Sequence, residues 1–130
     1  TFKLFMMVEI PSNVILINEF INSGIDGVSI GSNDLTMLIL GIDRDNQELS
    51  SEFDERNPAV LWAIKRVIDA CKKNKIDVSI CGGAPSVFPS IIEELVKWGI
   101  DSISVFSDAI DDTRRIIYFQ ERRMKEDVAE

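Results

Sequence analysis

The sequence predicts an α/β fold in which strands and helices alternate as βαβαβαβα around a parallel sheet. Short apolar runs rich in β-branched residues recur along the chain, and each is followed by a segment with the apolar spacing of a helix. Glycine, asparagine, serine and proline stand at the boundaries between these segments. Strands that alternate with helices in this way pair in parallel and are joined by right-handed crossovers.

The boundary residues place each element. Gly24 and Gly99 supply helix C-terminal stops, and Asn57 with Pro58 gives another helix a cap and a proline at its first position. The predicted strands are 3–9, 27–31, 77–81 and 102–106. The first predicted helix begins at Ser12 or Asn13 and ends at about Ser23, and the second spans 35–40. A polar loop between 41 and 57 leads to a third helix, which begins at Asn57. Of the last two predicted helices, one spans 86–98 and the other runs from Asp108 to about Lys125. The helix after Asn57 carries one apolar stripe, formed by Val60, Ala63, Ile64, Val67, Ile68 and Cys71.

Length and charge exclude several classes of protein. The chain has 130 residues, the size of one domain or of a piece of one. It begins in a predicted strand without Met or a targeting segment, so we expect it to have been cut from something longer. No apolar run is long enough to predict a membrane span. Fourteen basic against 22 acidic residues give a net charge of −8, which argues against binding to nucleic acid.

Histidine is absent, and the two cysteines do not form a CxxC motif. Zinc sites of the usual kinds and the Ser-His-Asp triad are therefore excluded. Cys71 lies in a predicted helix and Cys81 ends the strand 77–81. This usage fits a reducing compartment, so we expect a cytoplasmic protein.

Three predicted strands end in residue types that carry chemistry. Glu9 ends the first strand, Asp34 follows the second, and Cys81 ends the third. The carboxyl ends of parallel strands are where α/β sheets and barrels place their sites. Because Mg²⁺ prefers hard oxygen ligands, Glu9 and Asp34 could hold this ion together. Spacing alone leaves it open that Asp34 only caps the helix 35–40 and that Glu9 is a surface acid.

The residues before Asp34 suit an anion. Gly31 lets the backbone come close to a ligand, and Ser32 and Asn33 can offer N–H and amide donors to phosphate or carboxylate oxygens. Cys81, followed by two glycines, could be a proton donor or a nucleophile. A buried, inert cysteine is the commoner alternative.

Six motifs occur together in one order and spacing: MMVEIPSN, DGVSIGSNDLT, LGIDRD, FDERNPAV, SICGGAPS and GIDSISV. Together they strongly resemble the C-terminal domain of the phosphoenolpyruvate synthase (pyruvate, water dikinase) family. Related families are pyruvate, phosphate dikinase and enzyme I of the bacterial sugar phosphotransferase system. The likeness covers residues 4–118. It implies that the chain is the second half of a TIM (β/α)₈ barrel.

The resemblance also implies a site for phosphoenolpyruvate or pyruvate with Mg²⁺. The implied roles are metal ligands for Glu9 and Asp34, substrate binding for Gly31, Ser32, Asn33 and Asp34, and catalysis for Cys81, which would shuttle the proton at the methyl or methylene carbon. In the family a phosphohistidine on a separate domain carries the phosphoryl group. The absence of histidine here agrees with that division.

Three residues depart from the family pattern. Met37 stands where a Gln is usual, Gly83 where a Gln or Glu is usual, and Val87 where the synthases usually have an acid. Each departure removes a polar group near the expected pocket. The arginines that clamp the substrate in the family lie upstream of this chain.

The implied function is that of a phosphotransferase domain fragment in the conversion of pyruvate, ATP and water into phosphoenolpyruvate, AMP and phosphate. We expect the chain alone to be inactive. Its expected partners are the substrate, the missing barrel half and the phosphohistidine domain if these are separately encoded, and a second copy in a homodimer, since half a barrel leaves two unpaired sheet edges. A non-catalytic oligomeric or regulatory half-barrel is the alternative. A flavodoxin-like small-ligand binder is disfavoured because no phosphate loop or G-x-G-x-x-G is present.

Overall fold

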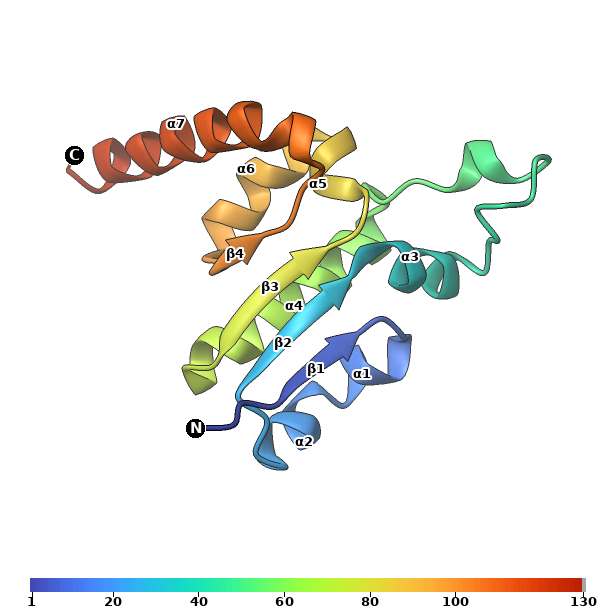
Figure 1. The fold of residues 1–130 in the computed structure, drawn as a ribbon, viewed down its shortest axis with the longest axis horizontal. Coiled ribbons are helices and arrows are strands. Elements are labelled where there is room, and N and C mark those ends of the chain that lie inside the picture. The colour runs from blue at the N-terminus through green and yellow to red at the C-terminus, as the bar shows by residue number, and fades with distance from the viewer. Residues whose placement is uncertain (130) are drawn as a thin grey trace.

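Four parallel strands form one sheet in the computed structural model, which describes residues 1–129 (Figure 1). The strands are β1 (Phe5–Val8), β2 (Gly27–Gly31), β3 (Asp77–Cys81) and β4 (Ser102–Ile103). Each strand pairs with the next one along the chain, in the order β1-β2-β3-β4. The predicted parallel α/β fold is therefore confirmed.

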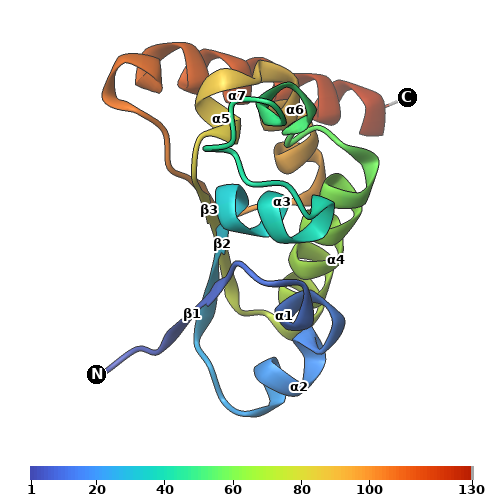
Figure 2. The ribbon, with the colours of Figure 1, turned by 90° about the vertical axis from the view of Figure 1, so that its right-hand side faces the viewer.

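Seven α-helices and two short 3₁₀ turns connect and follow the strands. They are α1 (Pro11–Ile15), α2 (Ile17–Asn22), α3 (Ser32–Leu40), η1 (Ser50–Glu52), α4 (Pro58–Asn74), α5 (Ala84–Val87), α6 (Pro89–Trp98), η2 (Ser107–Ala109) and α7 (Ile110–Val128). Figure 2 shows α1 to α4 gathered on one side of the sheet, while the other side of β1 and β2 faces away from them.

The strand order distinguishes between two α/β architectures. A flavodoxin-like sheet would place the second strand outside the first, in the order 2-1-3-4. Here the order is sequential, and the connecting helices cover one face only, which is how half of a (β/α)₈ barrel is arranged (Figure 2). The flavodoxin-like alternative is therefore wrong.

Successive side chains along each strand point to opposite faces of the sheet. The side chains that face the helices are fully buried in β2 and β3, as the pairs Val28–Val78 and Ile30–Ile80 show. The stripe predicted for α4 is buried against them, from Val60 to Cys71. Asn57 caps α4 as predicted, because its Oδ1 accepts the N–H of Ala59 at 2.9 Å.

The opposite face of the sheet is open in this chain. On β1, Phe5 and Met7 point to this face and are 48% and 43% exposed. Ser29 and Ser79 lie beside them in the neighbouring strands and are half-buried. In a closed barrel this face would line the interior.

The helix predicted from Ser12 or Asn13 to Ser23 differs from the structure. It begins at Pro11 and is interrupted at Leu16, which separates α1 from α2. The guanidinium of Arg66 on α4 donates to the carbonyls of Val14 and Ile15 at 3.0 and 3.1 Å. These carbonyls therefore have a partner outside their own helix, and the helix is free to break there.

A second predicted helix, 86–98, is also divided. It begins two residues earlier as α5 and breaks at Phe88, whose φ and ψ are −120° and 91°. Pro89 explains the break, because the residue before a proline is pushed out of the helical region.

The last strand is shorter than predicted, and the cap of the last helix is different. The strand predicted over 102–106 contains only Ser102 and Ile103. The N–H of Phe106 is donated to Ser86 Oγ at 2.9 Å, so the chain has left the sheet by that point. Asp108 lies in η2, and the N-cap of α7 is Ala109.

Candidate active site at the strand ends

The register brings the ends of β1, β2 and β3 into one row. Gly31 is paired with Cys81, and the last paired residue of β1, Val8, lies opposite Ile30. Glu9 follows Val8 directly and therefore lies next to Gly31. The strand ends that the sequence singled out are thus neighbours at one edge of the sheet, as expected for parallel strands.

Glu9 is half-buried against the backbone of Gly31. Its Oε2 and its Cβ both lie 3.1 Å from the position that a Cβ on residue 31 would occupy. The backbone N–H groups of Glu9 and Ile10 point to Oδ1 of Asn13 at 3.4 Å each, which holds the chain after β1. A side chain at residue 31 would therefore press on Glu9, and glycine leaves room for this close approach.

Ser32, Asn33 and Asp34 form the first turn of α3, which begins three residues earlier than predicted. The N-cap is Gly31, and no side chain accepts a hydrogen bond from the first turn. The idea that Asp34 caps this helix is therefore wrong, and the Asp34 side chain is exposed. Unpaired N–H groups at a helix N-terminus favour anions, so this turn retains donors for a phosphate or carboxylate.

The side chains of Ser32 and Asn33 already have partners. Ser32 is fully buried, and its Oγ donates to Glu55 Oε1 at 2.8 Å. Asn33 Oδ1 accepts the N–H of Gly83 at 3.0 Å. For an external ligand, Ser32 therefore has its backbone N–H, and Asn33 has its side-chain amide N–H groups.

The two cysteines are in different environments. Cys81 is half-buried at the end of β3, where Ser29 Oγ lies 3.7 Å from its sulfur. Cys71 is fully buried in α4, and burial raises the pKa of its thiol to about 11. Of the two thiols, only Cys81 lies at the candidate site with access from outside.

The donor set fits a magnesium ion only in part. Glu9 and Asp34 are carboxylates that the ion-pair network of residues 1–129 leaves free. Within that same part of the chain, no three His, Cys, Asp or Glu side chains are close enough to form a metal cluster. Mg²⁺ often takes one or two carboxylates and completes its shell with water and substrate oxygens. Two carboxylates such as Glu9 and Asp34 would suit that kind of site and would not suit an all-protein cage.

Glu55 is a site residue that sequence reasoning missed. The sequence placed it in the polar loop, yet its side chain is only 4% exposed. Burial raises the pKa of its carboxyl, although the hydrogen bond from Ser32, the backbone N–H of Ala84 and the charge of Arg44 act in the opposite direction. Nothing in the local pattern marks this residue, because its burial comes from contacts with residues distant in the chain.

The three departures from the family pattern occupy different surroundings. Met37 is half-buried in α3, and Val87 is 58% exposed at the end of α5. A Cβ on Gly83 would lie 3.5 Å from Asn33 Oδ1, which is ordinary contact. A larger side chain would therefore fit at residue 83 beside the candidate site.

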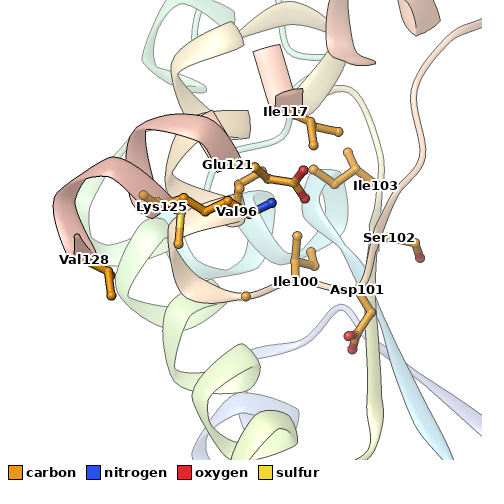
Figure 3. Close-up of a pocket in the computed structure, with 11 residues that line it drawn as sticks. Val96, Ile100, Asp101, Ser102, Ile103, Ile117, Glu121, Lys125 and Val128 are labelled. Atoms are coloured by element: carbon orange, nitrogen blue, oxygen red, sulfur yellow. The ribbon is translucent and has the colours of Figure 1, made fainter. Parts of the chain in front are cut away.

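A hollow of about 630 Å³ lies away from the strand ends, between α6, β4 and α7. In Figure 3, Ile117 and Glu121 of α7 lie across from Ile103 of β4. No sequence-predicted site residue lines it. The hollow adjoins β4, which is the last strand of the sheet and has one unpaired edge. It therefore lies at this edge of the sheet and is separate from the candidate site at the strand ends.

Comparison with known proteins decides the family. The model of the PEP-utilising enzyme PEP-binding domain matches residues 1–122. The chain belongs to this family. A probable phosphoenolpyruvate synthase from Staphylothermus marinus is 53% identical over 95% of the chain, and the phosphoenolpyruvate synthases of Aeropyrum pernix and Helicobacter pylori are 51% and 48% identical over the same share. The chain spans 15% of the length of each of these family members.

A solved structure supports the family's fold. The chain is similar to an HpcH/HpaI aldolase/citrate lyase family protein from Burkholderia cenocepacia, with a TM-score of 0.62 and 23% identity. The match covers 93% of this chain and 42% of the other protein. The resemblance to the PEP-utilising family stated from the motifs is confirmed. Within residues 1–129, no helix has the length and apolar content needed to cross a membrane.

Proposed function

We propose that this chain is the half-barrel that binds phosphoenolpyruvate or pyruvate in a phosphoenolpyruvate synthase reaction. The observation that carries the proposal is the convergence of Glu9, Cys81 and the uncapped first turn of α3 around Gly31. This edge offers carboxylates, N–H donors and a thiol within one row of strand ends. Groups of these kinds could bind an anionic three-carbon acid and transfer a proton at its carbon.

Each residue has a role that its position supports. The backbone at Gly31, Ser32 and Asn33 would bind the phosphate or carboxylate of the substrate, since the first-turn N–H groups of α3 have no side-chain cap. In the direction of phosphoenolpyruvate formation, the Cys81 sulfur would accept a proton from the methyl carbon of pyruvate, and in the reverse direction it would deliver that proton to the methylene carbon.

Glu9 and Asp34 would hold Mg²⁺. When bound, the ion would neutralise the negative charge of the phosphate and carboxylate oxygens. Glu9 would approach from β1 and Asp34 from the first turn of α3, which leaves the remaining positions to water and substrate. The full reaction with ATP, water and a phosphohistidine would need the other parts of a longer protein.

The open sheet face supports a further part of the proposal. Phe5 and Met7 are exposed on that face, and β1 and β4 each have an unpaired edge. In a complete barrel, the other half of the barrel would cover this face. In its absence we propose that two copies pair as a homodimer with two-fold symmetry.

The alternative is a non-catalytic half-barrel with an oligomeric or regulatory role. The observation that favours it is the loss of polar groups at Met37, Gly83 and Val87. Gly83 matters most, because this residue contacts Asn33 at the candidate site.

Calorimetric titration of Mg²⁺ in the presence of pyruvate tests the proposal. Glu9→Gln or Asp34→Asn should weaken Mg²⁺ binding about tenfold or more, because each removes a directly coordinating charge. Asp43→Asn and Asp45→Asn are the controls, since both acids are exposed in the loop after α3. Equal losses at all four positions would contradict a dedicated site. No Mg²⁺ binding by the unmodified chain would favour the non-catalytic half-barrel.

A further inference from the structure

Glu55 is the one acidic side chain that is buried among residues 1–129. It lies between η1 and α4, two residues before the α4 cap Asn57. Burying a carboxylate is costly unless hydrogen bonds or charges compensate for the lost water. The buried carboxylate of Glu55 therefore needs partners that compensate for the lost water.

The carboxylate of Glu55 contacts the ends of two neighbouring strands. Its Oε1 accepts the hydroxyl of Ser32 at 2.8 Å, and Ser32 directly follows β2. Its other oxygen, Oε2, lies 3.9 Å from the point where a Cβ on Gly83 would begin, in the segment that follows β3. One side chain from a distant loop thus joins the segments that follow β2 and β3.

A second connection lies beside the first. The N–H of Gly83 is donated to Asn33 Oδ1 at 3.0 Å. Gly82 has a φ of +114°, and a Cβ there would clash with Ser32 Oγ. The two segments therefore approach as closely as their backbones allow, with Ser32 and Asn33 on one side and Gly82 to Ala84 on the other.

We propose that Glu55 is a positioning residue, a buried clamp that joins the ends of β2 and β3 and so fixes the Asn33 amide and the Cys81 thiol for a phosphate- or carboxylate-bearing ligand. This inference rests on the proposed function. Glu55 is only 4% exposed and its Oε1 accepts the Ser32 hydroxyl, so we assign it no direct contact with the ligand. Its effect on binding must pass through the residues that it holds.

The clamp also ties the loop between α3 and α4 to the site. Residues 43–52 of this loop are exposed throughout, and Glu55 is the point where the loop enters the interior. Arg44, Asp54 and Arg56 are its charged neighbours; Arg56 is paired with Asp54, and its guanidinium lies 4.4 Å from the ring centre of Phe88. Loss of the carboxylate should therefore loosen both the strand ends and this loop.

Amide hydrogen exchange in the full chain tests the clamp without a ligand. In Glu55→Ala the amides of Gly83 and Ala84 should exchange at least about tenfold faster, because both lie beside the clamp and the Gly83 N–H is donated to Asn33 Oδ1 there. The amide of Val78 in the interior of β3 should follow only the change in global stability. Glu52→Ala is the matched control, since Glu52 is exposed in the same loop.

Binding of phosphoenolpyruvate with Mg²⁺ tests the role in positioning. Glu55→Ala should lower the affinity about tenfold, as for other residues that orient ligand-binding groups, and Glu55→Gln should lower it less because one acceptor oxygen remains. If Glu55→Ala does not fold, the Glu55→Gln variant is compared in the same two measurements, with faster exchange at Ala84 expected.

Three results would overturn the inference. One is unchanged exchange at Gly83 and Ala84 in a folded variant. Another is an unchanged affinity for phosphoenolpyruvate in a Glu55 variant whose Gly83 and Ala84 amides exchange faster, since Glu55 would then have a structural role only. If the unmodified chain does not bind phosphoenolpyruvate, the proposed function fails and the positioning role fails with it. The exchange at Gly83 and Ala84 then still decides whether the clamp exists.

Discussion

The carboxylate of Glu9 lies against the backbone of Gly31, with its Oε2 3.1 Å from the point where a side chain at residue 31 would begin. This contact joins the end of β1 to the start of α3. It also places one candidate metal ligand beside the turn that would bind the substrate. The missing side chain at residue 31 is what allows the link.

Replacement of Gly31 by alanine should therefore disturb the site more than the fold. The new Cβ would press on Glu9 and on the Met7 side chain, whose Cε lies 3.3 Å away. We expect a loss of about 1–3 kcal/mol in the free energy of unfolding, as for overpacking, and weaker Mg²⁺ binding. Urea denaturation and calorimetry measure the two effects. Gly83→Ala is the control, because its Cβ would meet only ordinary contacts; equal effects of both changes would argue against a specific Glu9–Gly31 contact.

The two thiols should react at very different rates. Cys81 is half-buried at the strand ends, whereas Cys71 is fully buried with a pKa raised to about 11 by burial. At about pH 8, iodoacetamide should modify Cys81 in the folded chain and Cys71 only after unfolding. Mass spectrometry of the digested protein identifies the modified residue. Modification of Cys71 in the native Cys81→Ser variant would contradict this assignment.

Glu55 should make stability depend on pH in a defined direction. Burial raises the pKa of its carboxyl above 4.5 in the folded state, so the folded chain holds this proton more tightly than the unfolded chain. The stability that it contributes is fully present below pH 4.5 and is lost as the pH rises through the raised value. The difference in unfolding free energy between the unmodified chain and Glu55→Gln should therefore shrink as the pH rises. Urea denaturation over a pH series measures it.

A carboxyl distant from Glu55 acts in the opposite direction and cancels in that comparison. The backbone N–H of Leu4 lowers the pKa of Asp26. This contribution is lost as the pH falls through the lowered value, and both proteins share it. A difference that is constant with pH would mean that Glu55 does not titrate with a raised pKa.

The chain alone should self-associate through the open sheet face. Sedimentation over a wide concentration range should show a dimer, and Met7→Glu should shift it towards the monomer by placing a charge on that face. Ile15→Glu is the control, since Ile15 is 62% exposed on α1, on the helical side of the sheet. An unmodified chain that is monomeric and cooperatively folded at all concentrations would contradict the proposed pairing of two copies.

The local features of this fold could be predicted from the sequence because they depend on residues close together in the chain. The strands 27–31 and 77–81 and the cap at Asn57 match the structure, since apolar runs and capping residues act over a few positions. The breaks at Leu16 and Phe88 show the limit. Pro89 accounts for the second break and was visible in the sequence, whereas the first depends on Arg66, which is distant in the chain.

By itself, the sequence determined the alternation of strands and helices, the family, and the row of chemical groups at the strand ends. Only the tertiary structure decided how those groups are arranged. It turned the Ser32 hydroxyl inward to Glu55 and placed Glu9 against Gly31. It also ended β4 after two residues, because the chain turns away to Ser86. The physical reason is that hydrophobic periodicity and capping are local, while burial of a single carboxylate depends on which distant segments meet around it.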